Sequence, residues 1–146
     1  MAELGGRSLV KFARLSDSAI FLEDSVGAVS LDDVGAVVSF SGIVRNHDGG
    51  RTVTLLEYEA HPSAAGILEA VTASVAADFP GVRIAIEHRI GALGVGELAL
   101  ACAVSSAHRA EAFAACTRLV DEVKHRVPIW KQQRFADGTS EWVGSL

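Results

Sequence analysis

The sequence predicts an α+β fold in which mixed or antiparallel sheets pack with two main helices. Short runs of β-branched, aromatic and small residues, such as GAVVSFSGIV, are bounded by turn residues and are typical of strands. Two other segments carry apolar residues at helical spacing. The 146 residues predict a single domain spanning 1–146, or two closely packed subdomains, because no linker or repeat interrupts them.

In the first half of the chain, strands alternate with one short and one long helix. The predicted strands are 10–15, 35–44 and 51–60, with a turn at 46–50 between the last two. A short helix is the interpretation of 22–29. A longer helix opens at His61-Pro62-Ser63 and ends before Pro80, and its buried face is marked by Ile67, Leu68, Val71 and Val75.

The second half predicts two strands, a long helix and a final strand pair. Residues 82–90 and 97–106 are predicted strands around a turn at Gly91–Gly96. Ser105 or Ser106 is expected to cap a helix over 108–126, which Pro128 ends. Extended residues 129–135, a turn at 136–139 and a short strand at 140–143 follow.

Composition and charge exclude several classes of protein. The net charge of −5 argues against a nucleic-acid-binding protein. No apolar run reaches the roughly 18 residues of a transmembrane helix, and the first residues lack the apolar core of a secretory signal, so a cytoplasmic location is expected. Cys102 and Cys116 form neither a CxxC pair nor a zinc-binding spacing and are predicted to be buried, reduced thiols.

One segment of this acidic chain is basic. Residues 101–134 contain six Lys or Arg and three Asp or Glu. A small anionic ligand would suit such a segment, although a basic helix face without any partner would give the same pattern.

The predicted helix at 108–126 has an apolar stripe that two cations interrupt. At 100° per residue, Cys116, Val120 and Val123 lie together on one side. Arg109 falls inside this stripe and Lys124 at its edge. Each is therefore paired, or reaches water along the stripe, or binds a ligand, and the spacing leaves these alternatives open. A desolvated lysine gives up its proton more readily, which suits general acid–base catalysis.

Further cations stand where an anion could bind. Lys131 follows the Pro128 break, and both amines would meet if this segment folds back beside the helix end. His108 and Arg109 begin a helix, where free N–H groups favour anions. Arg45 ends a strand just before a glycine-rich loop; a solvated loop arginine is an equal alternative.

The remaining polar residues give weaker signals. Glu57, Glu59 and His61 share one strand face, which could hold a metal, but a solvated face is favoured because no second histidine is near in sequence. His47 and His125 are expected to be exposed, and His88 is assigned only to a strand.

Four stretches of the sequence resemble one known family in their residues, order and spacing. They are GAVVSFSGIVR, SSAHRAEAF, DEVKHRVPIWK and the closing WV. From about Gly35 onward the chain is similar to the large, catalytic subunit of molybdopterin synthase. The resemblance implies an α+β fold with a β-hammerhead-like subdomain.

The resemblance also implies a reaction and its partners. The family transfers sulfur from the C-terminal Gly-Gly thiocarboxylate of a small β-grasp carrier subunit to cyclic pyranopterin monophosphate. The product is the dithiolene of molybdopterin, an intermediate of molybdenum cofactor biosynthesis. Two large subunits form a homodimer within a 2+2 heterotetramer. No cofactor, metal, nucleic acid or membrane is implied for this sulfurtransferase.

The family's functional residues map onto matching positions of this chain. Lys124 and Lys131 would be catalytic and would also bind substrate. The other substrate-binding positions would be Phe40, Ile43, Val44, Arg45, His108, Arg109, Gln132 and Gln133.

Some positions depart from the family pattern. Gln133 stands where many relatives carry an acid two residues after the second lysine, so any tuning of Lys131 by that acid would differ here. His61 replaces a frequent tyrosine. The chain ends four residues after Trp142, so a tail residue that completes a neighbour's pocket in relatives is expected to be missing or different.

Three other functions are weighed against this assignment. A catalytically silent homologue would bind the carrier without turnover, but the retained lysines argue against it. A phosphate- or pterin-binding module without chemistry would need no thiocarboxylated partner. A metal-dependent hydrolase would use His61 and the strand carboxylates and would lose activity with a chelator.

Overall fold

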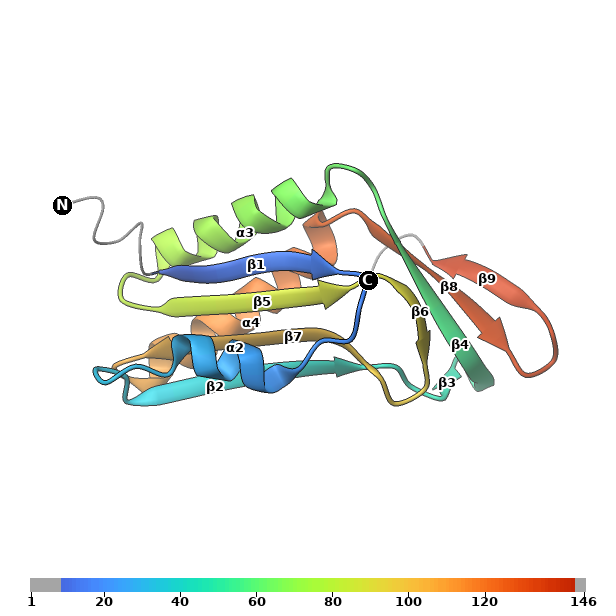
Figure 1. Ribbon diagram of the computed structural model, residues 1–146, viewed down its shortest axis with the longest axis horizontal. Coiled ribbons are helices and arrows are strands. Elements are labelled where there is room, and N and C mark those ends of the chain that lie inside the picture. The colour runs from blue at the N-terminus through green and yellow to red at the C-terminus, as the bar shows by residue number, and fades with distance from the viewer. Residues whose placement is uncertain (1–8, 144–146) are drawn as a thin grey trace.

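A four-stranded mixed sheet and a five-stranded antiparallel sheet organise residues 9–143, the part of the chain that the computed structural model describes (Figure 1). The helices are α2 (Leu22–Val29), α3 (Ala64–Asp78) and α4 (Arg109–Arg126). The strands are β1 (Val10–Ser16), β2 (Ala36–Ile43), β3 (His47–Asp48), β4 (Arg51–Ala60), β5 (Arg83–Arg89), β6 (Gly91–Gly94), β7 (Leu98–Ser106), β8 (Ile129–Phe135) and β9 (Ser140–Val143).

The first sheet has helices on both faces. Its strand order is β1-β5-β7-β2, with β1 parallel to β5 and the other neighbours antiparallel. Helices α3 and α4 cover one face, where Ile84 and Ile86 of β5 join the main core. Helix α2 covers the other face, where Ala85 packs with Val29. Because side chains alternate along a strand, β5 contributes to two cores, one on each face of the sheet.

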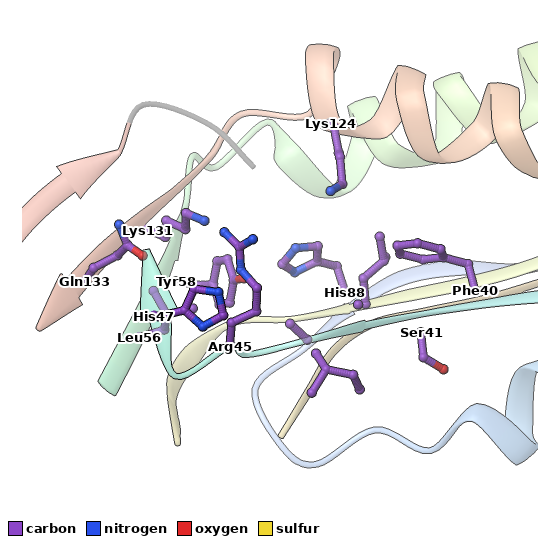
Figure 2. A pocket seen from close by; sticks show the side chains of 14 residues that line it. Phe40, Ser41, Arg45, His47, Leu56, Tyr58, His88, Lys124, Lys131 and Gln133 are labelled. Atoms are coloured by element: carbon purple, nitrogen blue, oxygen red, sulfur yellow. The ribbon is translucent and has the colours of Figure 1, made fainter. Parts of the chain in front are cut away.

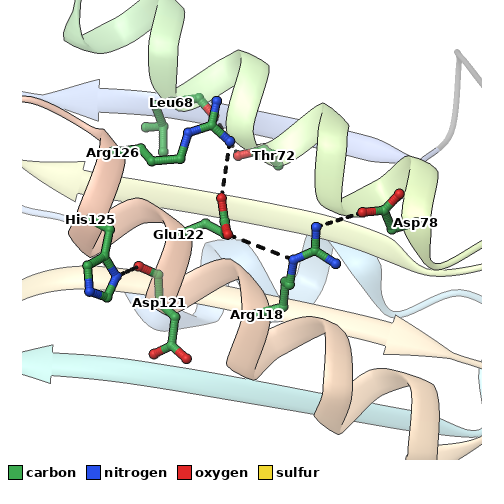
Figure 3. A network of polar contacts seen from close by, with 8 residues as sticks. All are labelled: Leu68, Thr72, Asp78, Arg118, Asp121, Glu122, His125 and Arg126. Atoms are coloured by element: carbon green, nitrogen blue, oxygen red, sulfur yellow. Dashed lines mark hydrogen bonds and ion pairs between the residues drawn. The ribbon is translucent and has the colours of Figure 1, made fainter.

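Helices α3 and α4 are also joined on their solvent side. Arg118 donates a hydrogen bond to Asp78 at 2.7 Å and lies 3.9 Å from Glu122, which also pairs with Arg126 (Figure 3). These are exposed ion pairs, so each adds little stability alone. The opposite face of α4 is buried in the core.

The second sheet stands at one end of the first (Figure 1) and has the order β3-β4-β8-β9, with β6 also paired to β4. Strand β8 begins close behind α4 because Pro128 cannot continue the helix. Its antiparallel register places Lys131 opposite Tyr58 and Gln133 opposite Leu56. The sharp β3–β4 turn uses Gly49 and Gly50 at φ of 57° and 78°.

Most predicted elements are confirmed, and so is the α+β class. The segment Gly91–Gly94, predicted as a turn, is strand β6, because its backbone pairs with β4. The predicted serine cap of α4 is wrong: Ser105 and Ser106 end β7, and His108 is the N-cap residue without a side-chain cap bond. The last residues of the tail, 144–146, lie outside the described part.

Two expectations about compartment can be compared with the structure. Cys102 and Cys116 are buried free thiols with their Sγ atoms 3.9 Å apart, as predicted. Within residues 9–143, none of the helices has the length and apolar character needed to cross a bilayer. The cytoplasmic location stays a prediction.

Candidate active site

A pocket of about 370 Å³ lies where the end of the first sheet meets the C-terminal turn of α4 and strands β4 and β8 (Figure 2). It is lined by Phe40, Ser41, Gly42, Ile43, Arg45, His47, Leu56, Tyr58, His88, Ala99, Leu100, Lys124, Lys131 and Gln133. Six of these side chains were predicted from the sequence to serve one site.

The structure brings the two predicted lysines to this one pocket. Lys124 extends from the last turn of α4 toward the pocket (Figure 2). Lys131 enters from β8, which folds back after Pro128. A ligand in the pocket would therefore meet two amines that are held by different elements.

Lys131 is the amine that the protein partly desolvates. It is half-buried, and this burial lowers its pKa below the ordinary value. The carboxylate of Asp48 opposes the shift, whereas the positive charges of Arg45 and Lys124 lower the pKa further. Partial loss of water and nearby cations together make Lys131 a better proton donor than a surface lysine.

Lys124 and Arg109 are exposed, so in the single chain both side chains reach water, which is one of the alternatives that the sequence left open. The predicted stripe is confirmed, because Cys116, Val120 and Val123 are buried, but the buried face of α4 also includes Ala112, Ala115 and Leu119. The buried face is thus rotated away from Arg109 and Lys124: small alanines pack inward, whereas Phe113 is 59% exposed.

Asp48 links the loop after β2 to β8. Its Oδ2 accepts a hydrogen bond of 2.7 Å from Nε2 of Gln133, and its Oδ1 lies 3.6 Å from the guanidinium of Arg45. The hydrogen bond from Gln133 lowers the pKa of Asp48, and the charges of Lys131 and Arg45 add to the effect. A carboxylate therefore stands beside Lys131, although position 133 itself is an amide.

Three predicted residues on the first sheet have different surroundings. Phe40 and Ile43 line the pocket, Ile43 with an exposed side chain. Val44 does not line it: the residue is buried and packs with Leu56 and Leu93 in a small core. The prediction of Val44 as a pocket residue is therefore wrong for its side chain, because the chain turns at this strand end.

Gln132 is also outside the pocket. Side chains alternate along a strand, so Lys131 and Gln133 share one face of β8 and Gln132 occupies the other. Its cross-strand neighbours are Glu57 and Trp142. The prediction that Gln132 lines the site is not supported by this geometry.

His108 and Arg109 lie at the opposite end of α4 from Lys124. They are exposed and line a separate hollow of about 380 Å³ together with Gly35, Ala36, Ala107 and Ala110. Fifteen positions of helix separate Arg109 from Lys124, which corresponds to ~22 Å at 1.5 Å per residue. Within one chain, this pair and the lysines cannot contact the same small molecule.

Four polar residues of the pocket were not predicted from the sequence: Ser41, His47, Tyr58 and His88. Tyr58 and His88 contact each other edge to face, with ring centroids 5.0 Å apart, and His47 stands at the rim. Burial raises the pKa of Tyr58 and lowers that of His88 to about 4. A histidine inside the apolar run VRIAIEHRI was the available signal, since a buried polar side chain needs a partner.

The metal alternative gains no support from the described residues. No group of three or more His, Cys, Asp or Glu side chains between residues 9 and 143 is arranged to hold an ion. His61 instead contacts Ser63 at 2.8 Å, and Glu57 lies 3.8 Å from Arg134.

Comparisons with known proteins agree with this fold. Residues 15–126 match the MoaE protein family. The chain is 45% identical over 111 residues to the molybdopterin synthase catalytic subunit of Nostoc sp., covering 75% of this chain and 67% of that protein. It is 37% identical over 145 residues to molybdopterin synthase catalytic subunit 1 of Mycobacterium tuberculosis, covering 99% and 98%.

A solved structure shares the architecture. Molybdopterin synthase from Staphylococcus aureus superimposes with a TM-score of 0.84 at 35% identity, over 90% of this chain and 96% of that one. The matches cover nearly the whole described fold, including both sheets and the pocket between them. The chain therefore belongs to the MoaE protein family, whose relatives are molybdopterin synthase catalytic subunits.

Proposed function

We propose that this chain is the catalytic subunit of a molybdopterin synthase and transfers sulfur from a thiocarboxylated carrier to cyclic pyranopterin monophosphate. The observation that carries the proposal is the convergence of Lys124, Lys131 and Arg45 on one pocket of about 370 Å³. Three cations in a small pocket suit a phosphate-bearing substrate. Family membership supplies the reaction.

The proposed chemistry assigns different work to the two lysines. Sulfur replaces oxygen at two adjacent carbons, and negative charge develops on the leaving oxygens. Lys131, whose pKa is lowered by burial, supplies or accepts the proton. Lys124 and Arg45 place positive charge where that negative charge develops. No step requires a redox cofactor.

The partner that delivers sulfur is proposed to be a small β-grasp subunit ending in a Gly-Gly thiocarboxylate. An extended Gly-Gly tail is narrow enough to enter a pocket that a folded domain cannot. Lys124 is exposed at the pocket in the single chain, so a docked tail could reach its amine. Docking would also remove water from the site and strengthen its electrostatic interactions.

His108 and Arg109 are proposed to bind the substrate's phosphate from a second copy of this chain. Their position at the N-terminus of α4 favours an anion. Because ~22 Å of helix separates Arg109 from Lys124, the pair can only complete the pocket of a neighbouring subunit. This part of the proposal therefore requires the homodimer.

The proposal is tested by comparing two forms of the carrier. The purified protein is mixed with cyclic pyranopterin monophosphate and a carrier that ends in either a thiocarboxylate or an ordinary carboxylate. We expect dithiolene product with the thiocarboxylate only, and no loss of activity with a chelator. Substrate binding without product would favour the binding module or the silent homologue, and chelator sensitivity would favour the hydrolase.

A further inference from the structure

His88 is buried within the fold and yet lines the pocket. It is the penultimate residue of β5, at the end of the strand that meets the second sheet, and only 1% of its surface is exposed. Figure 2 shows its ring at the pocket floor, with the side chain of Lys124 extending toward it from α4. The side chain therefore has a contact with the site but almost none with bulk water.

A backbone contact fixes which ring nitrogen carries the proton. Nδ1 of His88 lies 2.7 Å from the carbonyl oxygen of Arg89. A carbonyl oxygen can only accept, so Nδ1 bears the hydrogen and donates it. In the neutral ring Nε2 then keeps its lone pair and can only accept.

The surroundings of His88 keep the ring neutral. Burial lowers its pKa to about 4; the contact with Arg89 opposes the shift, and the charge of Lys124 adds to it. The other titratable groups that line the pocket are Arg45 after β2, His47 on β3, Lys131 on β8 and Tyr58 on β4. One carboxylate, that of Asp48, stands beside Lys131 and Arg45 and is not among the lining residues. The ring of Tyr58 meets that of His88 edge to face at 85° and holds its orientation.

The pocket thus joins two kinds of polar group. While they are protonated, Arg45, Lys124 and Lys131 donate hydrogen bonds and cannot accept them, so they suit an anion. A neutral imidazole with a free Nε2 suits the opposite partner, an N–H or O–H group. A ligand that satisfies both must carry a negative charge and a hydrogen-bond donor within one small molecule.

We propose that His88 is a specificity-determining residue whose Nε2 accepts a hydrogen bond from an N–H or O–H group of the bound substrate. The cations bind the phosphate, and His88 recognises the uncharged, donor-bearing part of the same molecule. This inference rests on the proposed function, because the substrate is taken from it. His88 lies outside the four stretches of sequence that resemble the family.

The test compares three variants for binding of cyclic pyranopterin monophosphate in the absence of carrier and for product formation with it. His88→Phe keeps an aromatic ring but removes the acceptor. Because one hydrogen bond to the substrate is lost, we expect about tenfold weaker binding and a raised KM. His88→Gln restores an acceptor oxygen and should recover part of the loss. His125→Phe is the matched control, because His125 makes the same kind of Nδ1 contact, at 2.7 Å to Asp121, outside the pocket (Figure 3).

A measurement on the wild-type protein covers the case in which His88→Phe does not fold. In ¹⁵N NMR spectra, Nε2 of His88 should resonate as an unprotonated nitrogen near neutral pH and move upfield when substrate binds. Wild-type affinity in folded His88→Phe, or an Nε2 resonance that substrate leaves unchanged, would overturn the inference while the sulfur transfer stands. A wild-type protein that neither binds substrate nor makes product would instead overturn the proposed function and this inference with it.

Discussion

Gln133 donates a hydrogen bond from Nε2 to the carboxylate of Asp48 at 2.7 Å, across the gap between β8 and the short strand β3. Gln133 is 3% exposed, whereas the Asp48 side chain is 38% exposed, so the contact is shielded from water only on the side of β8. The contact holds an acid beside Lys131, two positions from Gln133 along the strand. An amide at position 133 is thus compatible with a carboxylate beside Lys131, because the carboxylate comes from another strand.

Replacing Asp48 should change the titration of Lys131. The carboxylate raises the pKa of Lys131, while burial and the neighbouring cations lower it. Asp48→Asn keeps an oxygen that Gln133 can bond but removes the negative charge. We therefore expect the pKa of Lys131 to fall further, and the alkaline limb of the pH–rate profile to move to lower pH.

Asp137→Asn is the control for this experiment. The pKa of Asp137 is also lowered, chiefly by hydrogen bonds from Thr139, but Asp137 lies in the β8–β9 turn and does not line the pocket. It should leave the pH–rate profile unchanged. An unshifted profile in Asp48→Asn would show that Asp48 does not tune the amine.

Lys131→Met should separate stability from activity. Because burial holds the folded-state pKa of Lys131 below its ordinary value of 10.5, the protonated amine opposes folding at neutral pH. This penalty disappears as the pH rises through 10.5. The variant should therefore make no product, and yet its Tm at neutral pH should equal or slightly exceed that of the wild type. The difference in Tm is small because the side chain is only half-buried.

Thermal unfolding at several pH values checks this prediction, with Lys11→Met as a lysine control outside the pocket. The Tm advantage of Lys131→Met should shrink at alkaline pH. A large loss of Tm at neutral pH would mean that the attraction to Asp48 outweighs the cost of burial.

Arg109→Ala should weaken substrate binding and make that binding less dependent on salt, because one charge contact to the phosphate is lost. If Arg109 serves the pocket of a second copy, two inactive variants should complement each other. Random mixing of Arg109→Ala with Lys124→Ala would restore about a quarter of the sites.

Activity of the mixture measures this complementation directly. A mixture as inactive as its two components, in dimers shown to exchange subunits, would place Arg109 outside the neighbour's pocket. The substrate affinity of Arg109→Ala alone would then decide whether the residue has any binding role.

The sequence predicted elements well where local signals agree. The bounds of α2 were predicted without error, and Pro128 correctly separated α4 from β8. Strand β6 was missed because a four-residue segment that begins and ends with glycine looks like a turn until its partner strand is known. The buried face of α4 was predicted only in part, because the small side chains of Ala112 and Ala115 give a weak apolar signal although they are buried.

The candidate site was predicted only in part, because some of its residues give no clear signal along the chain. Lys124, Lys131 and Arg45 carry motif or charge signals that can be read along the chain. Tyr58 carries no such signal, and the signal of His88, a histidine in an apolar run, does not identify its partner. The two residues become neighbours only when β4 and β5, from different sheets, come together at the pocket. His108 and Arg109 do carry a signal, but one chain alone does not bring them to the lysines.

The most direct test of the account is sulfur transfer by Lys124→Ala. The variant is mixed with thiocarboxylated carrier and cyclic pyranopterin monophosphate, beside the wild type and Lys11→Ala, which loses the same charge away from the pocket. We predict dithiolene product from the wild type and Lys11→Ala and almost none from Lys124→Ala, which should fold normally because its side chain is exposed. Wild-type rates in folded Lys124→Ala would contradict the assignment of this pocket as the site of sulfur transfer.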